Sequence, residues 1–180
     1  MRDEKTWQDS ILPTMMDRFP PRIARDLKKY GRPKDVPPLG SYYVYGPTGT
    51  GKTILGAWMC LDACKVRYLE GKSMDVILTK TSELFFDLRR SYSDKSIDQH
   101  GYIEQHANTF FWVLDDFGSE RPTDWVGDIL YLLIDRRYEN LATTVFTSNH
   151  SLDELAQAFA DDRIPARIER MCKIIHKKKL

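Results

Sequence analysis

The sequence lacks the features that hold secreted and membrane proteins together. Its 180 residues include three cysteines, Cys60, Cys64 and Cys172, and an odd number without paired spacing argues against a disulfide framework and for a reducing compartment. The N-terminus MRDEKTWQDS has no apolar run and is therefore no secretory signal. No stretch approaches the roughly 18 consecutive apolar residues that a membrane-spanning helix needs. We therefore expect a cytoplasmic protein that contacts no membrane.

An excess of charge of one sign is also missing. The chain has 27 Lys and Arg and 26 Asp and Glu, so its formal net charge is +1. Any contact with nucleic acid must therefore come from a local patch and not from the field of the whole molecule. The cysteines do not suggest a metal site either. Cys60 and Cys64 could share a helix face, but no nearby His or Cys completes a ligand set, which favours two buried thiols.

What the chain does have is a regular alternation of strand-like and helical segments after residue 40. Apolar, β-branched and aromatic runs predict strands at 41–45, 75–79, 110–116, 143–149 and 172–176. Helical spacing of apolar residues predicts helices at 54–70, 82–92, 124–140 and 151–159, with a polar loop at 93–101. Such alternation is typical of an α/β fold with a parallel five-stranded sheet that is covered by helices on both faces.

The first forty residues differ from this core. Two proline pairs, Pro20-Pro21 and Pro37-Pro38, flank a short predicted helix at 22–31. The segment is too short to be a domain. We therefore predict an N-terminal arm over residues 1–40 and a core of single-domain size over residues 41–180.

The segment GPTGTGKT, residues 46–53, is the most informative motif. It matches G-x-x-x-x-G-K-[ST] and lies between a predicted strand and a predicted helix, where a phosphate-binding loop belongs. Backbone N–H groups of such a loop bind phosphate oxygens, while Lys52 reaches the β- and γ-phosphates and Thr53 offers its hydroxyl to Mg²⁺. The motif predicts ATP and Mg²⁺ as cofactors, with nucleotide contacts from Gly46, Pro47, Thr48, Gly49, Thr50, Gly51, Lys52 and Thr53.

Two acids end the apolar strand FFWVLDD at 110–116. Carboxylates in this place lie at the edge of the sheet where open α/β sheets bind their ligands. We predict that Asp115 holds Mg²⁺ and that Asp116 polarises the attacking water. Hydrolases of this kind more often carry Glu at the second position, so Glu120 is a reserve candidate for the base. The structural alternative is that the two acids form a simple turn or cap.

Two further groups of polar residues follow. The strand TTVFTSN at 143–149 ends in Asn149, whose amide could orient the water or contact the γ-phosphate, although Ser-Asn also forms ordinary turns. Arg163, Arg167 and Arg170 would share one side of a helix, with Pro165 restricting where that helix begins. A guanidinium stabilises the charge of a transferring phosphoryl group, whereas the structural alternative is a solvated basic face.

With these motifs in order, the chain resembles the AAA+ ATPases of the DnaC/DnaI/IstB group, which are bacterial and phage helicase loaders and their transposition-helper relatives. The resemblance runs from about Pro38 to His176 and rests on VLDDFGSERPTDWVGDILYLLIDRRYEN, TTVFTSNHSLDEL and DRIPARI. It implies an AAA+ core with the P-loop strand in the middle of the sheet. The chain departs from the family in that we expect no C-terminal lid domain after the last strand.

The resemblance also implies roles for individual residues. Asp115 and Asp116 would be the Walker B acids and Asn149 would be sensor 1. Arg167 would be an arginine finger that acts on ATP held by the neighbouring subunit of a homo-oligomer. Single-stranded DNA is the ligand of this family, and its contacts would fall on Arg89, Tyr92, Thr123 and Trp125. The alternative for Tyr92 and Trp125 is a role in packing.

The function expected from the resemblance is that of an ATP-hydrolysing helicase loader in DNA replication, which binds a replicative helicase and single-stranded DNA and works as an ATP-assembled oligomer. The alternative within the family is a transposition-helper ATPase that acts with a transposase on duplex DNA. Helicase loaders usually carry a separate N-terminal domain for the helicase, and the short arm leaves that contact open. A small-molecule kinase would need an acceptor pocket and an arginine-rich lid between the motifs, and the sequence indicates neither. A nucleotide switch that scarcely hydrolyses is kept open by Asp116 in place of Glu.

Overall fold

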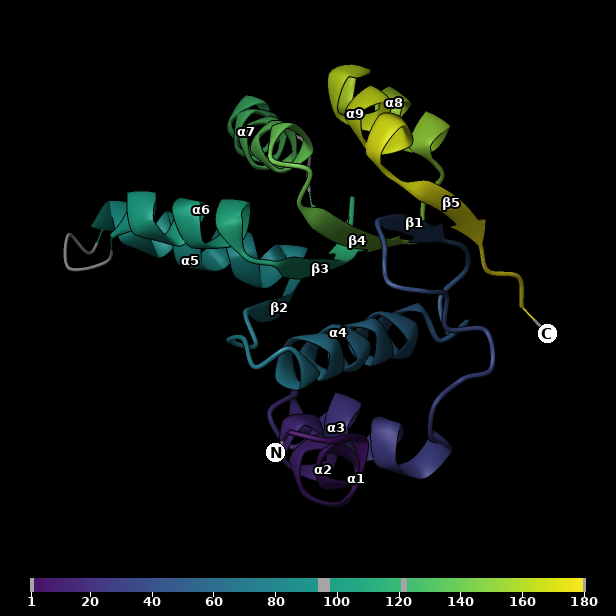
Figure 1. Ribbon diagram of the computed structural model, residues 1–180. Helices are drawn as coiled ribbons and strands as arrows, with labels where there is room; N and C mark the ends of the chain where they lie inside the picture. Colours follow the sequence, from purple (N-terminus) through teal and green to yellow (C-terminus); the bar gives the residue numbers. More distant parts are fainter. Residues whose placement is uncertain (1, 94–97, 121–122, 180) are drawn as a thin grey trace.

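The computed structural model describes residues 2–93, 98–120 and 123–179, and its centre is a five-stranded sheet (Figure 1). The strands are β1 (Tyr42–Tyr45), β2 (Val76–Lys80), β3 (Phe111–Phe117), β4 (Thr143–Ser148) and β5 (Lys173–His176). All paired strands are parallel, in the order β2-β3-β4-β1-β5. The predicted parallel five-stranded sheet is therefore confirmed, and each strand begins and ends within one residue of its predicted bounds.

The place of β1 in the sheet corrects one expectation. β1 is an interior strand between β4 and β5, and the middle of the sheet is β4. β4 is buried from Thr144 to Ser148, which suits a strand with two neighbours on each side. β5 carries Lys173 and the 45% exposed Ile174, and a charged, partly exposed strand suits an edge of the sheet.

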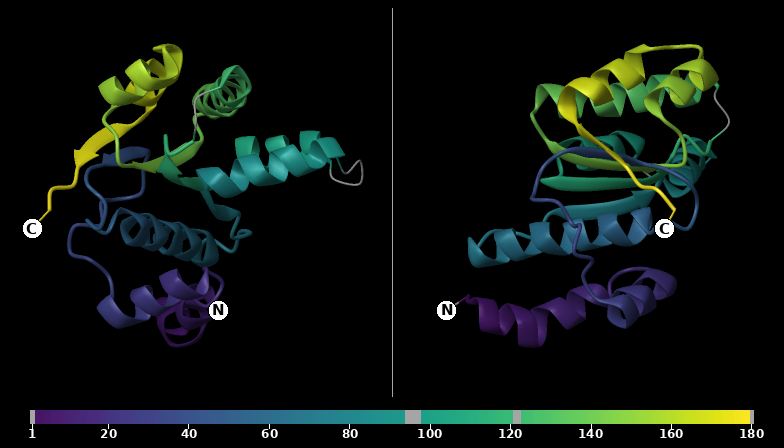
Figure 2. Two further views of the ribbon diagram at one scale, coloured as in Figure 1. Left: turned by 180° about the vertical axis from the view of Figure 1, so that it is seen from behind. Right: turned by 90° about the vertical axis from the view of Figure 1, so that its right-hand side faces the viewer.

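Helices cover both faces of the sheet (Figures 1 and 2). α4 (Lys52–Leu69) lies on one face, and the other face carries α5 (Thr81–Ser93), α6 (Gln99–Asn108), α7 (Asp124–Glu139), α8 (Leu152–Phe159) and α9 (Arg163–Met171). On the α4 side, Leu55 and Met59 pack against Val113 of β3. Among the described helices, none is long and apolar enough to cross a membrane.

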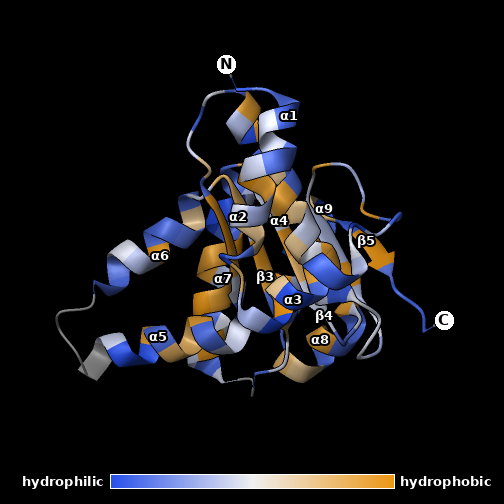
Figure 3. Ribbon diagram, turned by 90° about the horizontal axis from the view of Figure 1, so that it is seen from below, coloured by the Kyte–Doolittle hydropathy of each residue, from blue (hydrophilic) through white to orange (hydrophobic). Residues whose placement is uncertain are grey.

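Helix α6 was not predicted from the sequence. It begins within the range 93–101 that was predicted to be a polar loop, so the predicted loop extends too far. Residues 94–97 lie outside the described part, but α6 begins at Gln99. Most of α6 is hydrophilic (Figure 3), and its buried residues are His106 and Ala107 near its end. Because the segment has no apolar stripe and contains Gly101, its own sequence does not specify a helix. Packing against α5 and α7 therefore has to support it.

The N-terminal arm contains more structure than its one predicted helix. It consists of α1 (Glu4–Thr6), a π-helical turn η1 (Trp7–Ile11), α2 (Leu12–Met16) and α3 (Pro21–Tyr30). These segments lie on the side of α4 that faces away from the sheet (Figure 1). Trp7 is 2% exposed and packs with Tyr68, while Leu27 packs with Trp58. The arm thus forms an additional layer on the helix that follows the predicted phosphate-binding loop.

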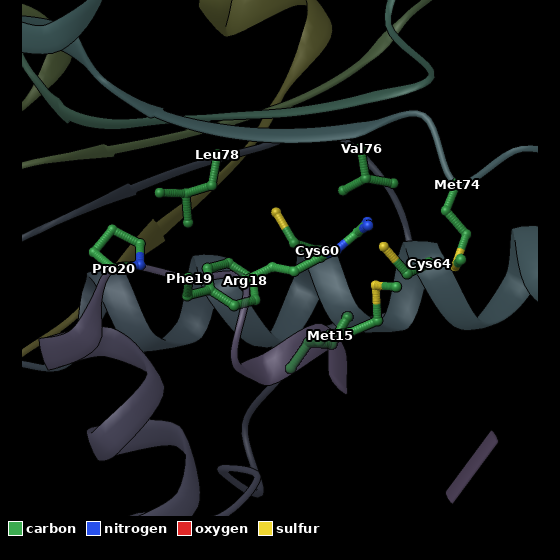
Figure 4. Close-up of a pocket in the computed structure, with 10 residues that line it drawn as sticks. Met15, Arg18, Phe19, Pro20, Cys60, Cys64, Met74, Val76 and Leu78 are labelled. Atoms are coloured by element: carbon green, nitrogen blue, oxygen red, sulfur yellow. The ribbon is translucent and has the colours of Figure 1, made fainter. Parts of the chain in front are cut away.

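A cavity of about 150 Å³ lies between the arm, α4 and β2 (Figure 4). Cys60 and Cys64 line it, next to Met15 of the arm. Both thiols are free and buried, and burial raises the pKa of Cys64 to about 11. Two neutral buried thiols are therefore what the structure has at this place, in agreement with the interpretation favoured from the sequence.

Candidate nucleotide-binding site

The loop between β1 and α4 has the backbone of a phosphate-binding loop. Gly46, Gly49 and Gly51 have φ values of +146°, +85° and +81°, a region in which other residues are strained. Gly46 has a second reason to lack a side chain, because a Cβ there would collide with the carbonyl oxygen of Lys177. The C-terminal segment after β5 therefore lies directly against this loop.

Lys52 begins α4 and points back into the loop. Its Nζ donates hydrogen bonds to the carbonyl oxygens of Gly46 and Pro47 at 2.7 and 2.9 Å, and to Oδ1 of Asn149 at 3.0 Å. All three ammonium protons are thereby used. Burial lowers the pKa of Lys52, and the nearby Asp116 and Asp115 carboxylates oppose that shift. The structure thus brings the predicted lysine and the predicted sensor asparagine into direct contact.

Asp115 is fully buried near the end of β3. The hydroxyl of Thr53 donates to its two carboxylate oxygens at 3.0 and 3.1 Å, and the hydroxyl of Thr147 donates to Oδ1. Burial raises the pKa of Asp115, whereas the hydrogen bonds from Thr147 and Thr53 lower it. A hydroxyl and a carboxylate in contact offer the hard oxygen donors that Mg²⁺ prefers.

Asp116 occupies an irregular point of the strand. Its φ is +57°, and the pairing of β3 with β4 shifts register between Leu114 and Phe117. Its N–H donates to Oγ1 of Thr147 at 3.1 Å. A bulge of this kind turns a side chain away from the regular alternation of the strand. Because β3 continues to Phe117, the acid pair is part of a strand and not a terminal turn or cap. Glu120 lies half-buried beyond the end of β3.

Two threonines in the site received no role from the sequence. Thr147 binds the Asp115 carboxylate and the Asp116 N–H, and Thr81 donates to the Asp115 carbonyl oxygen at 3.0 Å. The signal for Thr147 was its position two residues before Asn149 on the strand next to β3. That position becomes informative only when the register of β3 and β4 is known.

The predicted finger arginines lie against α7 of their own chain. Arg167 is on α9, forms an ion pair with Asp135 at 2.8 Å, and lies 4.7 Å from the ring centre of Tyr138. Arg163 pairs with Asp161 at 2.7 Å, and Arg170 is exposed. α9 includes Pro165 in its first turn, where proline is tolerated. The hydrogen bonds and ion pairs of the described residues therefore hold Arg167 at α7 and do not join it to Lys52 or Asp115.

The residues expected to contact DNA are only partly brought together. The Arg89 guanidinium lies 5.4 Å from the ring centre of Trp125, and that ring packs edge-on against Phe85 at 5.5 Å. The Thr123 hydroxyl accepts a hydrogen bond from the N–H of Val126 and caps α7. Trp125 thus packs against the core, as the structural alternative had it, while Arg89 stays exposed. The side chain of Tyr92 lies outside the described part.

Three solved structures have a similar fold. A crystal structure of the DnaC helicase loader is 21% identical, with a TM-score of 0.63 over 98% of this chain and 100% of that chain. A crystal structure of DnaI is 22% identical, with a TM-score of 0.64 over 86% of this chain and 82% of that chain. A structure of the replication initiator DnaA, bound to AMPPCP and single-stranded DNA, is 14% identical, with a TM-score of 0.64 over 92% of this chain and 50% of that chain. At these identities the likeness shows the fold alone.

The sequence itself matches a family. No curated protein matches significantly. The family model of the IstB-like ATP-binding proteins, however, matches residues 42–179, a range that includes the loop at 46–53, the acid pair and Asn149. The chain belongs to the family of IstB-like ATP-binding proteins, with an AAA+ core whose fold is similar to that of helicase loaders.

Proposed function

We propose that the chain hydrolyses ATP with Mg²⁺ at this edge of the sheet and works as an ATP-assembled oligomer that loads a replicative helicase onto single-stranded DNA. One observation carries the part of the proposal that concerns ATP hydrolysis. The ammonium of Lys52 contacts Asn149, and one residue later the hydroxyl of Thr53 contacts the buried carboxylate of Asp115. Membership of an ATP-binding family supports the same site.

The side chains and the loop fit ATP with Mg²⁺. Three glycines with positive φ let the backbone of the loop curl, so that the N–H groups of residues 48–51 can face phosphate oxygens. Thr53 and Asp115 would hold the metal, since their oxygens already lie together at 3.0 Å. When bound, Mg²⁺ would neutralise charge on the β- and γ-phosphates.

Each remaining residue then has a separate task. Lys52 would exchange the carbonyl oxygens of Gly46 and Pro47 for phosphate oxygens. Asp116 would accept the proton of the attacking water, and Asn149 would orient that water. The bulge at Asp116 supports its role, because a non-glycine residue at a φ of +57° is costly and such strain is concentrated at functional sites.

The position of Arg167 supports action between subunits. Within its own chain it is paired with Asp135 on α7. A finger acting in cis would lie at Lys52 and Asp115, so we infer that Arg167 reaches ATP in a neighbouring copy. A guanidinium placed there stabilises the charge of the transferring phosphoryl group.

The structural neighbours support a loader. The DnaC loader and this chain cover each other almost completely, and the DnaA neighbour is described with single-stranded DNA. We propose that DNA contacts Arg89 and its neighbours Tyr92, Thr123 and Trp125. We propose that the helicase contacts the arm of residues 1–40, which precedes the core of residues 41–180.

The family name favours a second candidate, a transposition helper that acts with a transposase on duplex DNA.

The hydrolysis proposal is tested by complementation. Lys52→Ala should abolish ATP turnover, and Arg167→Ala should bind ATP but hydrolyse it about 10³-fold more slowly, which is the contribution of a typical arginine finger. Mixed together, the two variants should recover turnover, because each supplies what the other lacks. Arg170→Ala on the same helix is the matched control and should retain turnover. A mixed oligomer without recovery would contradict a finger acting in trans.

The partner is tested by capture from host lysate on tagged protein with a non-hydrolysable ATP analogue, with Lys52→Ala as the control bait. A hexameric replicative helicase retained by the wild-type protein alone supports the loader. A transposase retained in the same way, with no helicase, would replace the loader by the transposition helper.

A further inference from the structure

Helix α3 of the arm presents a concentrated positive charge to solvent. Residues 22–34 hold six of the 27 Lys and Arg of the chain but one of its 26 Asp and Glu. The cations, here called the α3 patch, are Arg22, Arg25, Lys28, Lys29, Arg32 and Lys34, and all six are exposed. Since the net charge of the whole chain is +1, the rest of the molecule is net negative, and the positive charge of this segment is a local feature.

The helix directs these cations outward because its other side is buried. Ile23, Ala24 and Leu27 form the buried side, and Leu27 packs with Trp58 of α4. Arg22, Arg25 and Lys29 follow one another at spacings of three and four, so they share one side of the helix. At about 1.5 Å per residue the stripe is roughly 10 Å long, which is enough for successive phosphates of one nucleic-acid strand.

Stability does not account for the α3 patch. Arg22 lies in the first turn of α3, where the helix dipole disfavours cations, and that turn has neither an acid nor a side-chain cap. Exposed pairs such as Arg25 with Asp26 contribute little to stability, because water and salt screen them. Within the described part of the chain, Arg22, Lys29 and Lys34 have no carboxylate within ion-pair distance. These three cations are available to a partner, and so is Arg25, whose side chain is 70% exposed and is paired, among the residues that the structure describes, with the adjacent Asp26 alone.

Tyr30 points to the kind of polyanion. It ends α3, is 68% exposed, and lies 4.9 Å from the Lys29 ammonium. Proteins bind single strands by combining cations for the backbone with an aromatic ring on which a base stacks. A duplex, whose bases are already stacked, or an acidic protein would leave the ring unused.

We propose that the α3 patch binds single-stranded nucleic acid, with Arg22, Arg25 and Lys29 on the phosphates and Tyr30 under a base. This site is separate from Arg89 and Trp125, which lie on the other face of the sheet (Figures 1 and 2). It does not depend on ATP hydrolysis.

The test is fluorescence anisotropy of a labelled 20-nucleotide oligothymidine with the full chain, without nucleotide, over a series of KCl concentrations. Arg22→Ala/Arg25→Ala/Lys29→Ala should weaken binding at least tenfold and reduce the slope of log K against log salt by about 2, because three phosphate contacts at roughly 0.7 each are lost. Tyr30→Ala should weaken binding about 5-fold or more without changing that slope, and Tyr30→Phe should bind like the wild type.

The control variant Lys5→Ala/Lys65→Ala/Lys72→Ala removes the same number of charges outside the α3 patch and should bind like the wild type. Equal affinity of the α3 triple variant and this control would overturn the proposal. The proposal would also be overturned if a duplex or polyglutamate bound as tightly as the oligothymidine and Tyr30→Ala had no effect. The α3 patch would then bind polyanions without preference for single strands. Arg89→Ala/Trp125→Ala separates the two sites. If it abolishes binding while the α3 triple variant does not change it, the α3 patch is excluded and the contact proposed on α5 and α7 stands.

Discussion

Two buried cations lie at opposite ends of the sheet and are held in different ways. Lys52, 6% exposed, lies where β1 and β3 end, and its partners are two loop carbonyls and Asn149. Arg137, 0% exposed, lies where β3 and β4 begin. Its guanidinium donates to the carbonyl oxygens of His106, Ala107, Thr109 and Thr143 and to Oγ1 of Thr144, at distances from 2.6 to 3.3 Å.

The difference suits two roles. Lys52 is placed to bind the ligand that we propose, whereas Arg137 stabilises the fold. Two of the three partners of Lys52 are carbonyl oxygens of the loop at 46–53, which the phosphate oxygens of a bound nucleotide could replace, and two carboxylates lie nearby. The partners of Arg137 join the end of α6 to the starts of β3 and β4. Burial lowers the pKa of Arg137 to about 10, so it stays charged at neutral pH, and Trp112 lies 5.5 Å below it.

Arg137→Met should therefore produce the largest loss of stability. It leaves several buried acceptors without a donor, and breaking such an arrangement costs about 3–5 kcal/mol. For a domain of this size that corresponds to a fall of roughly 6–20 °C in the unfolding midpoint. Urea and thermal unfolding of the nucleotide-free protein measure both quantities.

The matched control is the adjacent Arg136. It forms an ion pair with Glu104 of α6, but its side chain is 37% exposed. Arg136→Met should cost less than about 1 kcal/mol, as for other surface pairs. If both variants unfolded at the same urea concentration, the five contacts of Arg137 would not be what joins α6 to the sheet.

This arrangement also explains what the sequence did and did not predict. The strands and the loop at 46–53 could be located because their signals are local runs and spacings. α6 could not, since its support includes Arg137, which is about thirty positions further along the chain. The contact of Thr147 with Asp115 depends on strand register, and that of Arg167 with Asp135 depends on how two helices meet. Such non-local contacts leave no pattern in a single sequence.

At the other end of the sheet, Asp115→Asn should raise stability and remove the response to ligand. Burial raises the pKa of Asp115 in the folded protein above its ordinary value. The folded state therefore binds more protons than the unfolded state between the two pKa values, so stability falls as the pH rises through that window. Asparagine avoids this loss while its oxygen still accepts from Thr53 and Thr147.

Thermal unfolding at several pH values measures this effect. At pH 7 without nucleotide the variant should unfold at a higher temperature, by about 2–4 °C for each 1 kcal/mol gained. The difference should shrink as the pH falls toward the ordinary pKa of an aspartate. ATP with Mg²⁺ should stabilise the wild type and not the variant. A variant less stable than the wild type at pH 7 would show that the charged carboxylate is favourable where it lies.

The smallest effect on stability is expected at Leu141, which has a left-handed backbone at the end of the sheet opposite to Asp116. Leu141, in the turn between α7 and β4, has a φ of +52° and is 91% exposed, and Asp116 has a φ of +57°. Leu141→Gly should raise the free energy of unfolding by up to about 1 kcal/mol and leave ATP turnover unchanged. Glycine adopts the left-handed backbone without strain, and the exposed leucine side chain contributes almost no buried surface that would be lost. Asp116→Gly should abolish turnover, because it also removes the carboxylate that is proposed to accept the proton. Reduced turnover of Leu141→Gly would contradict the expectation that the backbone at Leu141 has no part in ATP hydrolysis.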